Sequence, residues 1–415
     1  MENTITENNP DYKKTKLGWI PEDWDVAKFK ELCLNKGQYG INASAVNFSE
    51  HLPAYLRITD IDDDGKFSKT KKVSVDDINY KNFILIEGDI VFVRTGATVG
   101  KTYLYDPKDG ELVYAGFLIK FTPNKNKLNK KYLKYYTQTT SYWNWVRITS
   151  VRSGQPGINE TEYGEMLLPL APLSEQKAIA NCLSTWDTAI TKLDALIKAK
   201  QKLKKALMQQ LLSGKKRLPG FEGEWVEKRV DDFANEYSQK NDDNKDIEVL
   251  SCTKYDGLVP SLEYFGRQVF GDNLTKYKVV PRGYFAYATN HIEEGSIGYQ
   301  DFNELGLVSP MYTVFKTNET VDDNYLFKVL KSHKLIHEYN RRMEGSIDRR
   351  GGLRWKNFKG IKINLAQLEE QKAIAKVLDT ADQEINLLTN QRNQLQLQKK
   401  GLMQQLLTGK KRLNT

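Results

Sequence analysis

A segment of 49 residues occurs twice in this chain, and the repeat limits the possible folds more than any other feature. Residues 170–218 and 365–413 align without a gap at a spacing of 195 positions (365 minus 170), with 28 identities. The two copies end almost alike, in ALMQQLLSGKKRL and GLMQQLLTGKKRL. Self-similarity on this scale indicates that one structural unit is built twice.

Each copy of the repeat has apolar residues at the spacing of a helix that packs along one seam. The positions advance by alternating steps of three and four residues, the heptad pattern of a coiled coil. The seam residues are Leu183, Trp186, Ile190, Leu193 and Ile197 in the first copy, and Leu378, Ile385, Leu388 and Leu395 in the second. Polar residues interrupt the seam at Lys200, Lys204, Arg392 and Lys399. We expect these four to bury their methylene groups while their charges reach water.

Start and stop signals bound both helices. Pro172 and Ser174 precede the first helix, and Gly214 and Gly409 stand where a C-terminal glycine would end each one. We predict two helices of roughly 40 residues, each about 60 Å long. We expect them to form an antiparallel pair related by an approximate twofold axis, with their domains at opposite ends. The alternative is two unrelated surface helices, each packed on its own domain.

The segments that precede the two repeats share a plan, although they share little sequence. Trp24 in LGWIPEDWDV matches Trp225 in LPGFEGEWVE, and each segment continues with a β-rich run entered through a glycine turn. A helical stretch with a Tyr-Leu pair and a Gly/Ser/Arg-rich loop follow in both. We therefore predict an α+β fold of two globular domains joined by two long antiparallel coiled-coil helices with pseudo-twofold symmetry. The expected boundaries are 1–165 and 219–360 for the domains, and 166–218 and 361–415 for the helices.

Charge and composition favour an anionic partner and exclude several classes of protein. The net charge is +9, and the two repeats alone carry 18 positive and 8 negative residues, so the excess lies on the helices. No apolar run is long enough for a membrane span, and the N-terminus is polar. The three cysteines form no C-x-x-C pair, so we expect neither a disulfide framework nor zinc. We expect a soluble, cytoplasmic protein without membrane contact.

Motifs for catalysis or metal binding are incomplete in this sequence. GATVGKT has three residues between its glycines where a phosphate-binding loop has four, and HKLIH lacks the glutamate of a zinc protease. DIDDDGKF has calcium-loop spacing, but Lys71 stands at the twelfth position, so we expect an Asp-Gly turn. The N-P-P-F/Y tetrapeptide of amino-methyltransferases is missing. We predict no catalytic residues, no metal and no cofactor.

The repeated motifs resemble those of the DNA-specificity subunit of type I restriction-modification systems, over essentially the whole chain. LPLAPLSEQKAIANCL and INLAQLEEQKAIAKVLD carry the resemblance, with the LMQQLL-GKKRL endings and LGWIPEDWDV. The second copy departs only in its entry loop, where residues 364–367 read NLAQ in place of PLAP.

The resemblance implies two target recognition domains, each reading one half of a bipartite, asymmetric site on double-stranded DNA. It implies helices that fix the number of unspecified base pairs and dock two modification (methyltransferase) subunits. Those subunits, with motor-nuclease restriction subunits, would supply the chemistry and bind the methyl donor and ATP, so the chain itself is not expected to be an enzyme. A prokaryotic cytoplasm is the implied location.

The DNA contacts are expected in basic, glycine-rich loops of the two domains. Arginine pairs with guanine and glutamine with adenine in the major groove, whereas other contacts reach only phosphate. The candidates are Arg94, Lys101, Arg147, Arg152, Ser153 and Gln155 in the first domain, and Arg349, Arg350 and Arg354 in the second. Two other functions stay open: a free-standing bipartite DNA-binding regulator, and a non-enzymatic assembly scaffold.

Overall fold

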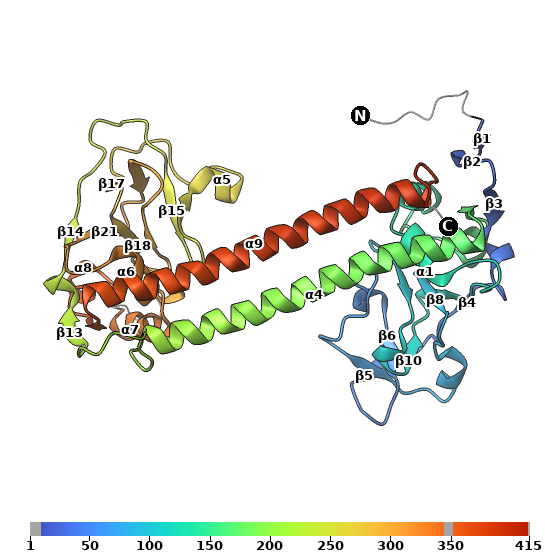
Figure 1. Ribbon diagram of the computed structural model, residues 1–415, viewed down its shortest axis with the longest axis horizontal. Helices are drawn as coiled ribbons and strands as arrows, with labels where there is room; N and C mark the ends of the chain where they lie inside the picture. Colours follow the sequence, from blue (N-terminus) through green and yellow to red (C-terminus); the bar gives the residue numbers. More distant parts are fainter. Residues whose placement is uncertain (1–9, 344–351, 414–415) are drawn as a thin grey trace. The chain divides into compact units, whose positions relative to one another are not determined.

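The structure is a computed structural model that describes residues 10–343 and 352–413. The chain divides into two compact units, one formed by residues 1–194 with 391–415 and the other by residues 195–390. Each unit holds one globular domain, part of helix α4 (Leu173–Leu211) and part of helix α9 (Leu368–Leu407) (Figure 1). Segments that are far apart in sequence therefore complete the first unit.

The two long helices have the length that the repeat predicts, with 39 residues in α4 and 40 in α9. Helix α4 begins two residues earlier than the sequence signals suggest, so Ser174 lies inside it. Beyond the two C-terminal ends, Gly214 and Gly409 have φ angles of 70° and 72°. This left-handed conformation costs little for glycine and lets the chain turn back, with Lys216 N donating to Gln210 O at 3.2 Å and Lys411 N to Gln405 O at 3.1 Å.

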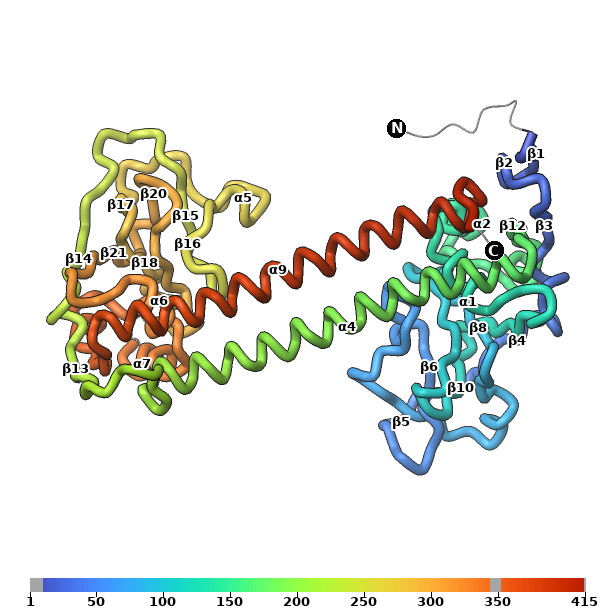
Figure 2. Tube along the Cα trace, in the orientation of Figure 1, coloured from blue at the N-terminus to red at the C-terminus, as the bar shows by residue number. Residues whose placement is uncertain are grey.

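Helices α4 and α9 run antiparallel in each unit. In the first unit Lys399 Nζ lies 2.6 Å from Asp187 Oδ1 and Arg392 Nε lies 3.9 Å from Asp194 Oδ1, so numbers rise on one helix as they fall on the other. In the second unit Lys200 Nζ lies 2.6 Å from Glu384 Oε1, and Lys204 pairs with Asp382. The tube in Figure 2 traces both helices side by side. The alternative of two unrelated surface helices is therefore wrong.

The heptad seam lies in the interface between the helices. Leu183 and Leu378 are fully buried, Ile190 and Ile197 are buried, and the remaining predicted seam residues are half-buried. The polar seam positions differ from expectation, because their charges reach acidic residues on the facing helix rather than water alone. The lysine and arginine stems still cover the seam, and the charged ends also fix its register.

The N-terminal domain combines two four-stranded sheets with short helices. The sheet orders are β4-β11-β8-β9 and β10-β6-β7-β5, and β1-β2 and β12-β3 form separate antiparallel pairs. The strands are β1 Tyr12–Thr15, β2 Gly18–Pro21, β3 Asp25–Lys28, β4 Gln38–Tyr39, β5 Ala45–Asn47, β6 Ala54–Leu56, β7 Val73–Val75, β8 Ile90–Val93, β9 Thr102–Leu104, β10 Leu112–Tyr114, β11 Leu118–Phe121 and β12 Leu167–Leu170. The helices are α1 Lys130–Tyr136, α2 Thr140–Thr149 and α3 Glu160–Gly164, with 3-10 turns η1 Phe29–Leu32, η2 Ile58–Asp60, η3 Tyr80–Phe83 and η4 Pro107–Asp109.

The C-terminal domain has one four-stranded sheet, in the order β14-β21-β18-β19, and three two-stranded pairs, β13-β22, β15-β16 and β17-β20, among its described residues. The strands are β13 Val226–Arg229, β14 Ala234–Tyr237, β15 Leu250–Thr253, β16 Gly257–Pro260, β17 Lys278–Pro281, β18 Phe285–Ala288, β19 Ile297–Tyr299, β20 Leu305–Val308, β21 Tyr312–Thr317 and β22 Lys362–Leu365. The helices are α5 Ser261–Phe265, α6 Asp323–Leu330, α7 His333–Arg342 and α8 Trp355–Phe358, with 3-10 turns η5 Val230–Asp232 and η6 Ile292–Glu294.

The two domains repeat one arrangement of central strands. Leu118 of β11 pairs with Val93 of β8, and Tyr312 of β21 pairs with Ala288 of β18, both antiparallel. Each predicted helical stretch is two helices, α1 with α2 and α6 with α7. The breaks occur because Thr139 and Ser332 cap the second helix of each pair with a side-chain oxygen. The α+β fold of two globular domains and two long helices is confirmed.

A glutamine at the start of each long helix fastens it to its domain. Gln176 accepts a hydrogen bond from Asn129 N at 2.8 Å and donates to Ala171 O at 2.9 Å. Gln371 does the same with Asp322 N at 2.9 Å and Ala366 O at 2.8 Å. Both glutamines are 1% exposed, so each amide replaces water for backbone groups that burial would leave unpaired.

The glutamate before each glutamine binds an arginine from the far end of the other helix. Glu370 receives Arg217 Nε at 2.6 Å and Trp225 Nε1 at 3.1 Å. In the first unit, Arg412 and Trp24 bind Glu175 in the same way. In both units, the E-Q motif at the start of one long helix therefore contacts the K-K-R motif that follows the other. This contact gives a physical reason why the two motifs occur together in both repeats. No helix among the described residues has the length and apolar character needed to cross a membrane.

Candidate nucleic-acid interface

Three segments of the N-terminal domain meet where strand β8 ends, and we call this place the N-terminal sheet end (residues 94–96, 115–117 and 152–158). Arg94 N donates to Phe117 O at 3.0 Å, and Ile158 N donates to Arg94 O at 2.8 Å. Gly96 N donates to Pro156 O at 3.0 Å. The backbone therefore holds loops from three parts of the sequence together, as the candidate residues in 94–96 and 152–155 require.

Arg94 is held in place by an aromatic ring that the sequence did not single out. Its guanidinium carbon lies 4.7 Å from the ring centroid of Tyr39, the last residue of β4. The Tyr39 hydroxyl accepts a hydrogen bond from Glu160 N at 3.2 Å, which fixes the ring. Stacking leaves the edge of a guanidinium available for hydrogen bonds. A strand of two residues gives no periodic signal, so Tyr39 could not have been found from the pattern.

The other candidates of this domain differ in what holds them. Arg152 donates two hydrogen bonds to Glu162, at 2.5 and 2.6 Å, and more to the carbonyls of Thr149 and Val151. Its guanidinium is therefore engaged within the loop. Ser153 and Gln155 are exposed on the same loop, and Gln155 lies beside Gly96.

Two predicted residues lie outside the N-terminal sheet end. Arg147 is an exposed residue of α2. Lys101 forms an ion pair with Asp63 at 2.6 Å. It also lines a cavity of about 360 Å³ between the Asp62–Gly65 turn and helices α4 and α9. In that turn Gly65 N donates to Asp62 O at 3.1 Å, and Lys66 N to Asp62 Oδ1 at 2.8 Å. The predicted Asp-Gly turn is confirmed.

The C-terminal domain has an equivalent place, the C-terminal sheet end (residues 289–291, 309–311 and 352–354). Leu353 N donates to Thr289 O at 2.8 Å, as Ile158 does to Arg94 in the other domain. Arg354 is exposed and stands at the N-cap of α8. Arg349 and Arg350 lie outside the described residues, so the structure places only Arg354 of the three predicted arginines.

A cavity of about 670 Å³ opens beside the N-terminal sheet end. Its lining includes Arg94, Tyr39, Phe117, Tyr55 and Arg57. Arg57 is bound to Asp60 through two hydrogen bonds of 2.9 Å, which raise the pKa of the guanidinium, and Tyr55 donates to Ile41 O at 3.0 Å. Tyr55 and Arg57 are therefore fixed by internal contacts, whereas the Phe117 side chain is 58% exposed.

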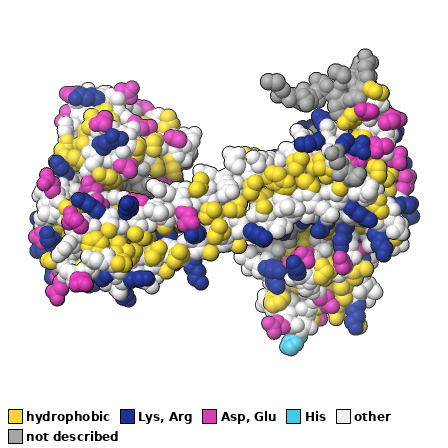
Figure 3. Space-filling model, viewed as in Figure 1, with side chains coloured by type: hydrophobic (Ala, Val, Ile, Leu, Met, Phe, Trp, Pro, Cys, Tyr) yellow, Lys and Arg dark blue, Asp and Glu magenta, His cyan; other side chains and the backbone are white. Residues whose placement is uncertain are grey.

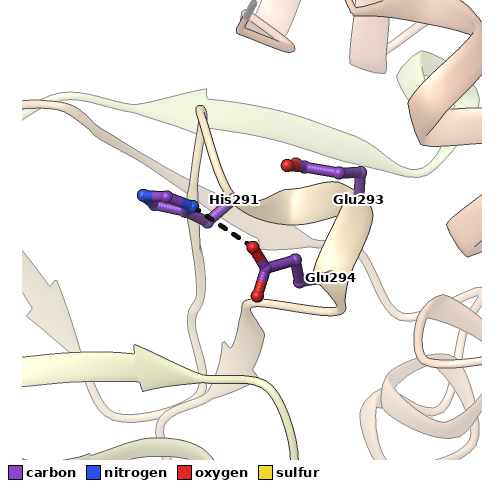
Figure 4. Close-up of side chains that lie close together, drawn as sticks. All are labelled: His291, Glu293 and Glu294. Carbon is purple, nitrogen blue, oxygen red and sulfur yellow. Dashed lines mark ion pairs between the residues drawn. The ribbon is translucent and has the colours of Figure 1, made fainter. Parts of the chain in front are cut away.

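One cluster of possible metal ligands lies in the described part of the C-terminal domain, beside the C-terminal sheet end. His291, Glu293 and Glu294 each direct a donor atom to a common region, and these atoms lie within 4.8 Å of one another (Figure 4). His291 Nδ1 lies 3.7 Å from Glu294 Oε1, and both side chains are about half exposed. The ion pair between His291 and Glu294 explains why these two side chains lie together, without a metal ion.

Comparison with known proteins places the chain in a family. Residues 21–204 and 222–397 both match the family described as the type I restriction modification DNA specificity domain. The chain belongs to that family. Each match spans one globular domain and much of the long helix that follows it.

Members of the type I specificity family also match along nearly the full length of the chain. The putative type I restriction enzyme MjaX specificity subunit of Methanocaldococcus jannaschii is 30% identical, covering 97% of both chains. The MjaVIII specificity subunit of the same organism is 26% identical, covering 95% of this chain and 94% of the relative. This chain thus has the DNA-specificity role, which it performs with DNA and with other subunits of a type I restriction-modification system.

Solved structures of specificity subunits share the fold. The HsdS subunit from Thermoanaerobacter tengcongensis has a TM-score of 0.53 at 17% identity, covering 94% of this chain and 98% of that one. The type I S subunit from M. genitalium has a TM-score of 0.55 at 15% identity, covering 97% and 98%. A chain from a study of the assembly and conformational transition of the type I R-M system has a TM-score of 0.57 at 16% identity, covering 94% and 99%.

Proposed function

We propose that this specificity subunit reads a bipartite, asymmetric DNA site, one half with each globular domain. The carrying observation is that the two sheet ends share a backbone hydrogen bond to the residue after β8 or β18, Ile158 N to Arg94 O and Leu353 N to Thr289 O, and have different side chains there. Arg94 follows the central strand in the N-terminal domain, whereas Thr289 takes that position in the C-terminal domain. Equivalent positions with unlike hydrogen-bonding groups read unlike bases, so the two half-sites differ.

The side chains at the sheet ends suit base edges as well as phosphates. An arginine that forms two hydrogen bonds with guanine, or a glutamine with adenine, contributes about 1 to 3 kcal/mol of discrimination. Arg94 is already oriented by Tyr39, so it loses less side-chain entropy on binding than a free arginine would. Among the predicted candidates of this domain, Arg94 and Gln155 are therefore the proposed base contacts. Arg152 is proposed to order the loop instead.

The long helices are proposed to set the number of unspecified base pairs between the half-sites. Helices of 39 and 40 residues are each about 60 Å long, longer than the roughly 34 Å that separate equivalent groove positions one turn apart. Lengthening both helices would then lengthen the spacer and leave the bases read unchanged.

The helices are also proposed to dock the other subunits. Each helix carries two leucines away from the seam, Leu196 and Leu203 on α4 and Leu387 and Leu397 on α9, with 41%, 52%, 69% and 64% exposure. Figure 3 shows hydrophobic side chains among the residues of the long helices on the face that it displays. Exposed leucines in such number on long helices favour a protein partner. We assign this surface to two modification subunits, which together with motor-nuclease subunits act in the cytoplasm of a prokaryote.

The chain itself is proposed to perform no chemical step and to bind no cofactor. The methyl donor and ATP would be bound by the partner subunits. This division is supported by the composition of the sheet ends, which offer groups for binding nucleic acid and for holding loops in place. A methylation assay on the isolated chain with the methyl donor and DNA should give no product, and product formation would contradict this part of the proposal.

Specific binding by the assembled complex tests the proposed function. The site is first identified by sequencing methylated bases in DNA modified by the complex. Binding is then measured on duplexes with the intact site, with either half-site scrambled, and with both scrambled. We expect the intact site to bind at least a hundredfold more tightly than the fully scrambled one, with each half contributing. Equal affinity for all four duplexes would refute the proposal, and equally tight specific binding without modification subunits would support the free-standing regulator.

A further inference from the structure

An exposed apolar side chain stands at the same fold position in both domains. Phe117 is 58% exposed and Met311 is 60% exposed. Phe117 directly precedes β11, which pairs with β8, and Met311 directly precedes β21, which pairs with β18. The turns that present them close alike, with Leu118 N donating to Ala115 O at 2.8 Å and Tyr312 N to Ser309 O at 2.9 Å.

Both residues lie beside the position that follows the central strand. The Phe117 carbonyl accepts a hydrogen bond from Arg94 N at 3.0 Å, and the Met311 carbonyl accepts one from Thr289 Oγ1 at 2.8 Å. Phe117 also lines the 670 Å³ cavity together with Arg94. Each apolar side chain is therefore part of the surface proposed to face DNA.

The fold does not need these side chains to be apolar. The contacts that close each turn come from the backbone, and more than half of each side chain is left in water. A single exposed apolar residue is common on protein surfaces. Two at equivalent positions, in domains with little sequence in common, indicate a shared task.

We infer that Phe117 and Met311 each contact the C5-methyl group of a thymine in the major groove, one in each half-site. This inference rests on the proposed function of the two domains. The thymine methyl is the apolar group that base edges present in that groove, and phenylalanine is among the side chains that contact it. Arg94 beside Phe117 has donors for a neighbouring guanine or phosphate, which favours DNA over a protein partner at this surface.

The test compares thymine with deoxyuridine, which differs only by the methyl group. Each thymine of the identified site is replaced singly, and binding is measured for the assembled complex. We expect one position in each half-site where the substitution weakens binding about three- to fivefold, the effect of one buried methyl group. Phe117→Ala should abolish this sensitivity in one half-site, and Met311→Ala should abolish it in the other. Phe117→Leu should keep it.

Matched controls separate this role from a general loss of apolar surface. Ile78→Ala in the N-terminal domain and Leu262→Ala in the C-terminal domain remove side chains that are 94% and 58% exposed and lie outside the sheet ends. Both should keep the full uracil sensitivity.

The possible outcomes are distinguishable. Uracil tolerance within twofold at every position, with specific binding intact, overturns the inference and leaves the proposed function standing. Weaker binding of modification subunits by Phe117→Ala or Met311→Ala without DNA would assign the surface to a protein partner and also overturn it. Loss of all site preference in the unaltered complex would instead count against the proposed function.

Discussion

The guanidinium of Arg412 forms a bidentate ion pair with the buried carboxylate of Glu175, which lies 237 positions earlier in the chain, at 2.6 and 2.8 Å. The same carboxylate accepts a hydrogen bond from Trp24 Nε1 at 3.0 Å. Three segments, from the first strands of the domain, the start of α4 and the residues after α9, are thereby joined at one buried charge. The pKa of Arg412 is raised, because hydrogen bonds with Asp23 and Glu175 favour its charged form.

Removing Arg412 should destabilise the first unit strongly. Arg412→Ala leaves the buried carboxylate of Glu175 without a counter-charge, although Trp24 Nε1 still donates to it. Breaking a fully buried pair costs about 3 to 5 kcal/mol of the free energy of unfolding, and because the Arg412 side chain is 39% exposed we expect about half of that. Urea denaturation measures the loss. Lys411→Ala, at the neighbouring exposed position, is the control and should change stability by less than about 0.5 kcal/mol. Equal stability of the two variants would show that the ion pair contributes nothing.

The pair between Lys399 and Asp187 should make the first unit sensitive to acid. Burial alone would raise the pKa of Asp187, but hydrogen bonds from Lys399 and Tyr135 outweigh it, so the pKa lies below its ordinary 3.8. A lowered folded-state pKa stabilises the protein above the unfolded-state value, and that contribution is lost as the pH falls through the folded-state pKa.

Asp187→Asn should therefore narrow its stability gap to the unaltered protein as the solution is acidified. Urea denaturation between pH 7 and pH 3 measures the gap, which should be constant near neutrality and shrink below about pH 4. Asp243→Asn, at an exposed loop position whose side chain is 76% exposed, is the control and should show no such change. A gap independent of pH would mean that Asp187 does not act through its charge.

Arg94 and Arg152 should differ in their effect on base discrimination. Arg94→Ala should lower discrimination at one position of one half-site by about 1 to 3 kcal/mol, because an oriented guanidinium is lost. Arg152→Ala should leave discrimination at that position nearly intact, since Glu162 already holds its guanidinium. Competition binding with single-base variants of the site measures both. The reverse ranking would assign base contact to Arg152.

The exposed leucines of the long helices should matter for assembly and not for folding. Leu387→Ser and Leu397→Ser should each weaken binding of modification subunits by about tenfold, as expected when an apolar contact at an interface is truncated. Titration followed by calorimetry in the absence of DNA measures the affinity. Ile78→Ser is the control on a domain surface. Unchanged affinity in both leucine variants would move the docking surface elsewhere.

Lengthening the helix pair should lengthen the DNA spacer. Lys200 and Glu384 face each other, so seven residues inserted beside each would keep the heptad pattern in register. Seven residues add about 10 Å, or about three base pairs at 3.4 Å each. Sequencing of methylated bases gives the spacer directly. A site with the original spacer would contradict the proposal that the helices set the spacer length. A longer spacer with altered half-sites would contradict the proposal that each domain reads its half-site independently of the helices.

The repeat was enough to predict the long helices, their direction and the shared plan of the domains, because periodic residues such as Leu183 and Leu378 report their own environment. The repeat alone could not predict contacts between residues that are far apart in the sequence. Arg412 reads as one of several basic residues near a helix end, and only the fold shows that its partner is Glu175. The sequence predicts solvated charges at Lys204 and Lys399, because their acidic partners lie on the facing helix and cannot be identified from the pattern of one helix.

The loop pattern predicted part of the candidate interface, because it contains Arg94 and Gln155, but it did not show what holds each side chain. Arg94 and Gln155 are brought together by backbone hydrogen bonds between strand ends, as a glycine-rich loop pattern suggests. Tyr39 and Glu162 decide which arginine is oriented outward and which is held inward, and neither belongs to a motif. Phe117 was overlooked because an exposed apolar residue has no signature until its neighbours are known.

Since residues 391–415 are part of the first unit, that unit cannot be finished during synthesis when its own domain emerges from the ribosome. The apolar stripe at the start of α4 then stays uncovered until the second long helix has been translated. In this interval a chaperone or a second nascent chain would find an open helix surface. The N-terminal half therefore reaches its native state only after this distant segment has been synthesised.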